Sequence, residues 1–365
     1  MQRERLDLAT DYVAAQSQLE LLLCQIMAEA LELDVVGVDD DFFALGGDSL
    51  AAERLFVGIE VSTGRRLPLA TLYDHPTVRQ LAVLLSAAHA LPWSALVKLR
   101  GGSGNPALFI VPGIGGEVIG MEPLVRHLDD DRPVYCCHFI GLDAAQAPLR
   151  SIEDIAAVFL PQILRVQTSG PYHLLGACFG GLVAVEIAKR LRLAGQQVGM
   201  LCLADAPFPE AGAAGKRTRV PAVIGLLASR ARLFARELTV RPMRARMSYV
   251  LDKLRRIASV AVGGLPGPVK LELAKRRVID SNREATRRYF VDKQPGNAIY
   301  VRSGGRQAGA PQARRDTWRN SFAAGVHVHT IDCCDSGDMF RGHARELAGI
   351  VSTALRVHDP AVLQE

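Results

Sequence analysis

From residue 107 onward, short apolar runs alternate with amphipathic helical stretches, and this alternation constrains the fold more than any other feature of the chain. Six apolar runs have the length of strands: 107–113, 133–141, 172–178, 198–207, 297–305 and 326–334. Helical periodicity is clearest between or after them in 151–167, 181–195 and 343–357. Strands joined through helices pair in parallel by right-handed crossovers, so the sequence predicts an α/β sheet covered on both faces.

The first 88 residues lack this alternation and predict a separate, small all-helical domain of four helices. Helical periodicity covers 17–30 and 49–63, where Gly64 ends the second helix, and a shorter helix is predicted within 78–89. With 365 residues, the chain is long enough for two domains that each have a core.

The remaining boundaries follow from breaks in the pattern. Residues 89–106 contain two prolines and a Gly-Gly-Ser-Gly cluster and are predicted to be a linker. The α/β domain is predicted to span 107–357 and to be followed by a tail at 358–365. Residues 210–290 interrupt its rhythm with arginine-rich helical segments, so we interpret them as a helical lid inserted over the carboxyl edge of the sheet.

Composition excludes several classes of protein. No apolar run reaches the roughly 18 residues that a membrane helix needs, and the first residues lack the apolar core of a signal peptide, so we expect a cytoplasmic protein without membrane contact. The seven cysteines include no CxxC pair, so no metal site is predicted. The adjacent pairs Cys136–Cys137 and Cys333–Cys334 lie in apolar runs and are predicted to be buried free thiols.

Charge is unevenly distributed along the chain, whose formal net charge is +5. Residues 216–277 carry sixteen Lys or Arg against three acidic residues, whereas Asp39, Asp40 and Asp41 form an acidic run in the helical domain. The basic segment lacks interleaved aromatic residues, so nucleic acid is not an expected partner. It is either a solvated lid surface or a surface that attracts the acidic domain.

Ser49 is the first candidate site residue. It follows two glycines and Asp48 at the start of an apolar helix, so Asp48 or Ser49 could simply cap that helix. However, DDDFF, LGGDSL, RLFVGIE and LPLATLYDHPTV together resemble, in order and spacing, a carrier of the peptidyl and acyl carrier protein family. The resemblance implies that Ser49 carries covalent 4′-phosphopantetheine, attached by a phosphopantetheinyl transferase.

Cys178 is the second candidate. It lies within Gly-Ala-Cys-Phe-Gly, between an apolar strand and a helix, which is the context of a nucleophile elbow, although a buried cysteine at a glycine-rich turn would have the same local pattern. The glycine-rich turn of ALFIVPGIGG ends an earlier strand. The backbone N–H groups of Ile114 and Phe179 are therefore predicted to form an oxyanion hole. Asp205 ends the strand after the elbow helix, so its carboxylate could reach the same crevice.

The motifs LFIVPGIGG, GPYHLLGACFGG, LCLADAP and VHVHTIDCC resemble those of the α/β-hydrolase thioesterases that terminate nonribosomal peptide and polyketide assembly lines. The resemblance implies Cys178 as nucleophile and Asp205 as the acid. An acyl or peptidyl thioester delivered by upstream synthetase modules would pass from Ser49 to Cys178, and release would follow by cyclisation, condensation or hydrolysis. The alternative is a degenerate thioesterase that holds the carrier-bound chain without turnover.

Two positions depart from the family pattern. Cysteine replaces the usual serine nucleophile, as in a minority of the family; an engineered substitution would have the same effect. The base position falls on Ser336, which cannot act as a general base near pH 7. Three interpretations stay open: His343 reaches Cys178 from a re-routed loop, no histidine is used, or the base has been lost. A cysteine tolerates a missing base better than a serine because part of a thiol population is already ionised at neutral pH.

Overall fold

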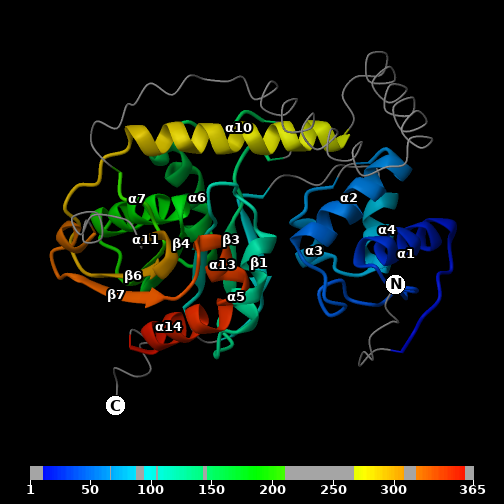
Figure 1. Ribbon diagram of the computed structural model, residues 1–365, viewed down its shortest axis with the longest axis horizontal. Coiled ribbons are helices and arrows are strands. Elements are labelled where there is room, and N and C mark those ends of the chain that lie inside the picture. The colour runs from blue at the N-terminus through cyan, green and yellow to red at the C-terminus, as the bar shows by residue number, and fades with distance from the viewer. Residues whose placement is uncertain are drawn as a thin grey trace, which may run out of the picture.

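The computed structural model describes residues 11–65, 67–87, 94–103, 106–142, 146–209, 267–307 and 318–357 (Figure 1). Several sequence predictions lie outside these residues: the first ten residues of the helical domain, part of the linker, residues 210–266 of the lid and the tail at 358–365.

The N-terminal domain contains the predicted helices. They are α1 (Gln18–Leu31), α2 (Ser49–Thr63), α3 (Thr71–Asp74) and α4 (Val78–Ser86). Local sequence sets their ends: Ser17 and Glu20 form a capping box at α1, Asp48 accepts the Ala51 N–H at the start of α2, and Gly64 ends α2 with a φ of 70°. Apolar faces of α1, α2 and α4 meet in one core. The prediction of a small helical domain is confirmed.

The second domain contains a seven-stranded sheet. Its strands are β1 (Leu96–Arg100), β2 (Leu108–Val111), β3 (Val134–Cys137), β4 (Tyr172–Ala177), β5 (Val198–Ala204), β6 (Ala298–Ser303) and β7 (Val326–Ile331). The spatial order is β1-β3-β2-β4-β5-β6-β7, and all neighbours are parallel except the β1–β3 pair. Each of the six predicted apolar runs contains one strand, so the predicted α/β sheet is confirmed.

β1 corrects the prediction for residues 89–106, since the expected linker contains an antiparallel edge strand of the sheet. Only Val97 in β1 is buried, because an edge strand packs against one neighbour and alternates with solvent. The five residues of β1 include two charged side chains and lie between prolines and glycines, so the sequence alone does not predict a strand here.

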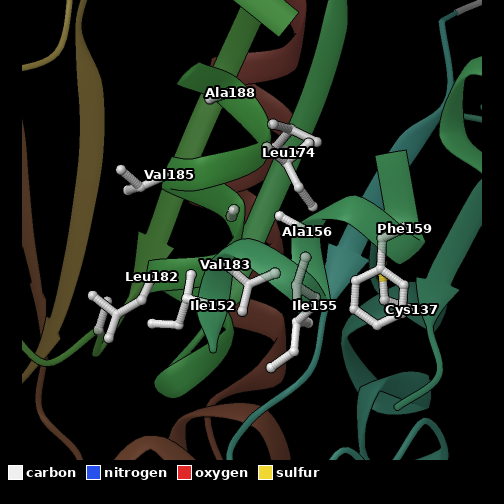
Figure 2. Close-up of a cluster of buried hydrophobic side chains, with 14 of the residues drawn as sticks. Cys137, Ile152, Ile155, Ala156, Phe159, Leu174, Leu182, Val183, Val185 and Ala188 are labelled. Carbon is white, nitrogen blue, oxygen red and sulfur yellow. The ribbon is translucent and has the colours of Figure 1, made fainter. Parts of the chain in front are cut away.

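Helices cover both faces of the sheet (Figure 1). One face packs against α6 (Ile152–Val166), α7 (Phe179–Leu193) and α10 (Gly267–Arg288), and Figure 2 shows Ile152 and Ile155 of α6 beside Leu182 and Val183 of α7. The other face packs against α5 (Glu122–Arg126), α13 (Ser336–Arg341) and α14 (Ala344–Val357). Short turns of helix occur at α11 (Gly304–Gln307), η1 (Ile119–Met121) and η2 (Arg319–Ser321).

The two domains touch along the side of the sheet near β1. Ile119 of η1 packs into the core of the helical domain, and Ala70 packs against the core of the α/β domain. The Tyr73 hydroxyl donates to the Val118 carbonyl at 3.5 Å. α10 also reaches across to α2, so one helix contacts both domains (Figure 1). Among the helices within the described ranges, none combines the length and apolar character needed to span a bilayer.

Candidate active site

Cys178 occupies a sharp turn between β4 and α7. Its backbone has a φ of 48° and a ψ of −119°, a conformation that L-residues other than glycine rarely adopt. The Cys178 N–H donates to the Ala204 carbonyl at 2.7 Å, and the Cys178 carbonyl accepts from Gly181 N–H at 2.9 Å. Neighbouring elements therefore fix this strained turn on both sides.

Two glycines make the turn possible because other chain segments pass close to them. A Cβ on Gly176 would lie 2.4 Å from the Gly181 Cα, and a Cβ on Gly180 would lie 2.3 Å from the Val111 carbonyl oxygen. The spacing of small residues around Cys178 is therefore a steric requirement of the elbow.

The Cys178 thiol differs from most other cysteines in its exposure. Cys178 is half-buried, whereas Cys24, Cys136, Cys137, Cys202 and Cys333 are buried and Cys334 is exposed. Burial raises the pKa of Cys202 to about 12 and that of Cys24 to about 11, so these thiols stay protonated and unreactive near neutral pH. The prediction that Cys333 and Cys334 are both buried is therefore confirmed for Cys333 and wrong for Cys334.

The turn after β2 lies directly beside Cys178. Gly116 N–H donates to the Gly113 carbonyl at 2.8 Å, which closes a β-turn around Ile114, and a Cβ on Gly113 would lie 3.9 Å from the Cys178 Cβ. Within the described part of the chain, neither Ile114 N–H nor Phe179 N–H has a hydrogen-bond acceptor. Both amides are thus available at this edge of the sheet.

Asp205 directly follows β5, the strand next to the elbow. Ala177 and Ala204 are register partners in β4 and β5, so Cys178 and Asp205 leave adjacent strands at the same edge. Asp205 is 3% exposed, has a φ of 51°, and accepts hydrogen bonds from Ser303 Oγ at 2.9 Å and Ser303 N–H at 3.3 Å. Sequence reasoning missed Ser303, although a serine ending the neighbouring strand β6 is a detectable signal.

The loop after β7 holds the two candidates for the base position. Ser336 is the first residue of α13, which Asp335 caps. His343 immediately precedes α14, and its Nδ1 lies 3.7 Å from Asp338 Oδ1. His343 thus lies beside Asp338 at a distance too long for a hydrogen bond, and within the described residues His343 makes no hydrogen bond to Cys178.

Cys333 lies in the same loop region, where burial, followed by the charges of Asp338 and Asp205, raises its pKa to about 11. Donor atoms of Cys333, Asp338 and His343 lie within 4.8 Å of one another and form the sole group of potential metal ligands in the described residues.

Ser49 begins α2 in the helical domain, after the glycine turn of Gly46 and Gly47. A Cβ on Gly46 would meet no atom within 4 Å, so the backbone before Ser49 has open space beside it. The positive end of the α2 dipole also favours an anion. These features fit a phosphodiester-linked group at this helix start.

The fold and the elbow define a thioesterase domain joined to a carrier domain. Residues 106–354 match the family described as "Thioesterase domain", and residues 22–85 match "Phosphopantetheine attachment site". The chain therefore belongs to the thioesterase domain family, and its helical domain is a carrier that takes covalent 4′-phosphopantetheine on a serine.

Its relatives include large peptide synthetases. The chain is 36% identical over 200 residues to malpinin synthetase of Mortierella alpina, covering 54% of this chain and 3% of that one. It is 36% identical over 207 residues to a dimodular nonribosomal peptide synthase of Bacillus subtilis, covering 54% and 9%. A crystal structure of a holo four-domain nonribosomal peptide synthetase bound to AMP and glycine matches 95% of this chain with 27% of its own, at 25% identity and a TM-score of 0.58. The chain thus spans less than a tenth of the malpinin and dimodular synthetases.

Proposed function

We propose that this chain releases acyl or peptidyl chains from a nonribosomal peptide or polyketide assembly line, with Cys178 as nucleophile. The observation that supports this most directly is the half-buried Cys178 on a strained strand-to-helix turn, beside the Ile114 and Phe179 amides, which have no acceptor among the described residues. Upstream synthetase modules supply the chain, a phosphopantetheinyl transferase modifies Ser49, and the reaction takes place in the cytoplasm.

The reacting thiol acts in one acyl-transfer step. When attached to Ser49, 4′-phosphopantetheine supplies a thiol on which the acyl chain is held as a thioester. Cys178 Sγ forms a bond to the carbonyl carbon, while Ile114 and Phe179 N–H groups donate to the oxygen as negative charge develops there. Losing one such donor raises a barrier by about 3 kcal/mol. The bond from the carbonyl carbon to the carrier's sulfur then breaks, this sulfur takes up the proton that Cys178 lost, and the chain is left as a thioester on Cys178, ready for attack by a second nucleophile.

We propose His343 as the candidate base for the Cys178 proton. His343 Nδ1 lies 3.7 Å from Asp338 Oδ1, which is too far for a hydrogen bond, so Asp338 does not fix the orientation of the imidazole ring. Asp205 with Ser303 forms a buried polar group beside Cys178. Within the described residues no hydrogen bond joins His343 to Cys178, so either a loop movement brings them together or the thiolate acts without a histidine.

A second candidate function has one observation in its favour. The resemblance puts the family's base position at Ser336, the first residue of α13, and among the described residues no hydrogen bond joins His343 to Cys178. A domain without a working base would hold the carrier-bound chain without turnover.

Trapping distinguishes the two functions. The purified chain is loaded at Ser49 with hexanoyl-4′-phosphopantetheine by a transferase and hexanoyl coenzyme A, and is then analysed by intact mass and peptide mapping. We expect the hexanoyl group on Cys178 within minutes, and its absence from a Cys178→Ala variant. Complete modification of Ser49 with no acyl group on Cys178 would support the holding function. Two variants then identify the base. His343→Ala slows acylation if His343 is the base, whereas Ser336→His speeds acylation if the base position is empty.

A further inference from the structure

Asn282 of α10 contacts the turn that carries Ile114. Its Nδ2 donates to the Ile114 carbonyl at 2.8 Å, and the residue is only 2% exposed. A buried amide donor is costly unless it is hydrogen-bonded, so the site favours the arrangement in which this bond is made. The bond joins residues 168 positions apart in sequence. It ties the described part of the lid to the edge of the sheet beside Cys178.

The bonded carbonyl belongs to the central peptide of the 113–116 turn. In such a turn the central peptide can flip by about 180° when a glycine follows it, since glycine accepts either sign of φ. Gly115 is that following residue. The Gly116-to-Gly113 hydrogen bond closes the turn in either case, so it does not select between the two orientations. The Asn282 amide selects one of them.

Lys275 lies seven residues before Asn282 on the same helix, about two turns or 10 Å away and therefore on the same face. Its ammonium lies 2.8 Å from Glu117 Oε1, three residues beyond Ile114, and also pairs with Glu53 of α2 in the carrier domain. Only 13% of the side chain is exposed. Burial opposes its charge, but Glu117 and Glu53 together raise the Lys275 pKa, so the lysine stays charged.

One face of α10 therefore contacts both the 113–117 segment and the carrier. Asn282 binds the Ile114 carbonyl, and Lys275 pairs with Glu117 and with Glu53 of the carrier. Glu53 lies four residues after Ser49, one helical turn along α2. The Lys275–Glu53 contact thus lies close to Ser49 at the start of α2, whereas the Asn282–Ile114 contact lies beside Cys178.

We propose that Asn282 is a positioning residue that fixes the orientation of the Ile114 turn, and that Lys275 couples this turn to carrier docking through Glu53. The peptide held by Asn282 carries the Ile114 carbonyl and the Gly115 N–H, whereas Ile114 N–H belongs to the preceding peptide, so Asn282 acts on that donor through the backbone angles of Ile114. The proposal rests on the proposed function insofar as Ile114 serves the oxyanion. Docking of the carrier favours the α10 position in which Asn282 holds the turn, so the amides are ordered when the acyl chain arrives.

Hydrogen–deuterium exchange of the full chain in its holo form tests the positioning without requiring turnover. Asn282→Ala is expected to raise exchange of the amides in 113–117 at least tenfold. Asn282→Asp at pH 8 is expected to do the same, because it keeps the size and loses the donor. Ser281→Ala is the matched control, because its hydroxyl makes an equivalent bond to the Leu149 carbonyl, outside this turn. Unchanged exchange at 113–117 in both Asn282 variants would overturn the proposal.

A second exchange experiment tests the coupling between carrier docking and the 113–117 turn. Glu53→Ala should raise exchange at 113–117 at least threefold in the wild-type background and have no further effect in a Lys275→Ala background. Arg276→Ala is the control, since Arg276 pairs with Glu272 within α10 at 3.0 Å. An equal effect of Glu53→Ala in both backgrounds would refute the coupling through Lys275.

Acyl transfer from a soluble N-acetylcysteamine thioester separates this proposal from the proposed function. Asn282→Asp is expected to lower kcat ten- to hundredfold with KM within twofold of wild type, whereas the control Arg276→Ala, which loses only its pair with Glu272 within α10, leaves this carrier-independent reaction unchanged. If the wild-type chain forms no Cys178 adduct at all, the proposed function fails, while the exchange measurements still decide whether Asn282 orders the turn.

Discussion

Replacing Gly180 by alanine tests the geometry of the elbow most directly. The added Cβ would lie 2.3 Å from the Val111 oxygen and 2.4 Å from the Pro112 oxygen, whereas real Cβ contacts are essentially never below 3.0 Å. Both oxygens belong to the backbone at the end of β2, so no side chain can rotate away. The start of α7 and the end of β2 must therefore separate by at least about 0.7 Å.

The separation should cost both stability and rate. Overpacking of this kind typically costs about 1–3 kcal/mol, offset by up to about 1 kcal/mol because alanine favours a helix over glycine. We expect a net loss of about 1–2 kcal/mol in the free energy of unfolding. The same movement displaces Phe179 N–H from Ile114 N–H, and misplacement by about 1 Å can cost about a hundredfold in rate. Acylation of Cys178 should therefore slow by roughly ten- to hundredfold.

Two measurements check this prediction. Urea unfolding is followed by the fluorescence of Trp318, which is buried in the thioesterase domain, in a Trp93→Phe background that leaves it as the sole tryptophan. Acylation is followed by intact mass with a soluble thioester. Gly349→Ala is the control: a Cβ there meets no atom within 4 Å in the middle of α14, so this variant should gain about 0.5–1 kcal/mol. A Gly180→Ala variant within 0.5 kcal/mol and twofold of wild type would refute the steric argument.

Three further predictions concern single side chains. Brief alkylation of the native chain at pH 7.5 should label Cys178 and Cys334 and spare the buried thiols, as mapped by peptide mass; labelling of Cys202 at a similar rate would contradict the structure. Ser303→Ala should lower the free energy of unfolding by about 1–2 kcal/mol because Asp205 loses a buried hydrogen bond, and an unchanged urea midpoint would argue against that bond. Because burial raises the pKa of Cys333, the folded state holds the thiol proton more tightly than the unfolded state does. The protonated thiol makes its full contribution to the free energy of unfolding below about pH 9, where the unfolded thiol is also protonated. This contribution is lost as the pH rises towards 11. Urea unfolding at pH 8 and 10.5 should therefore show a larger decline for wild type than for Cys333→Ala, and equal declines would exclude this linkage.

The fold could be predicted from the sequence largely because its signals are local. The central parallel strands β2, β4 and β5 are apolar runs buried on both faces, and α2 lies between the caps Asp48 and Gly64 as these residues indicate. β1 escaped prediction because an edge strand buries little and because its pairing with β3 is not written in its own five residues.

The site could be predicted in part, for a related reason. Cys178 and Ile114 are marked by glycine patterns that their tight turns require, so the sequence alone points to them. Asn282 and Lys275 have no such mark, since their roles depend on contacts with residues 168 and 222 positions away. For His343, the sequence gives a position near the family's base but cannot give the direction of its ring, which the structure turns towards Asp338.

The left-handed backbone at Cys178 has a consequence for how such a domain evolves. A residue held in a region that favours glycine typically costs about 1–3 kcal/mol of folding free energy. Cys178→Gly would therefore yield a domain that melts at a higher temperature than the wild type. Under the proposed function the same change removes the nucleophile, so selection for thermal stability and selection for chain release act in opposite directions at this position.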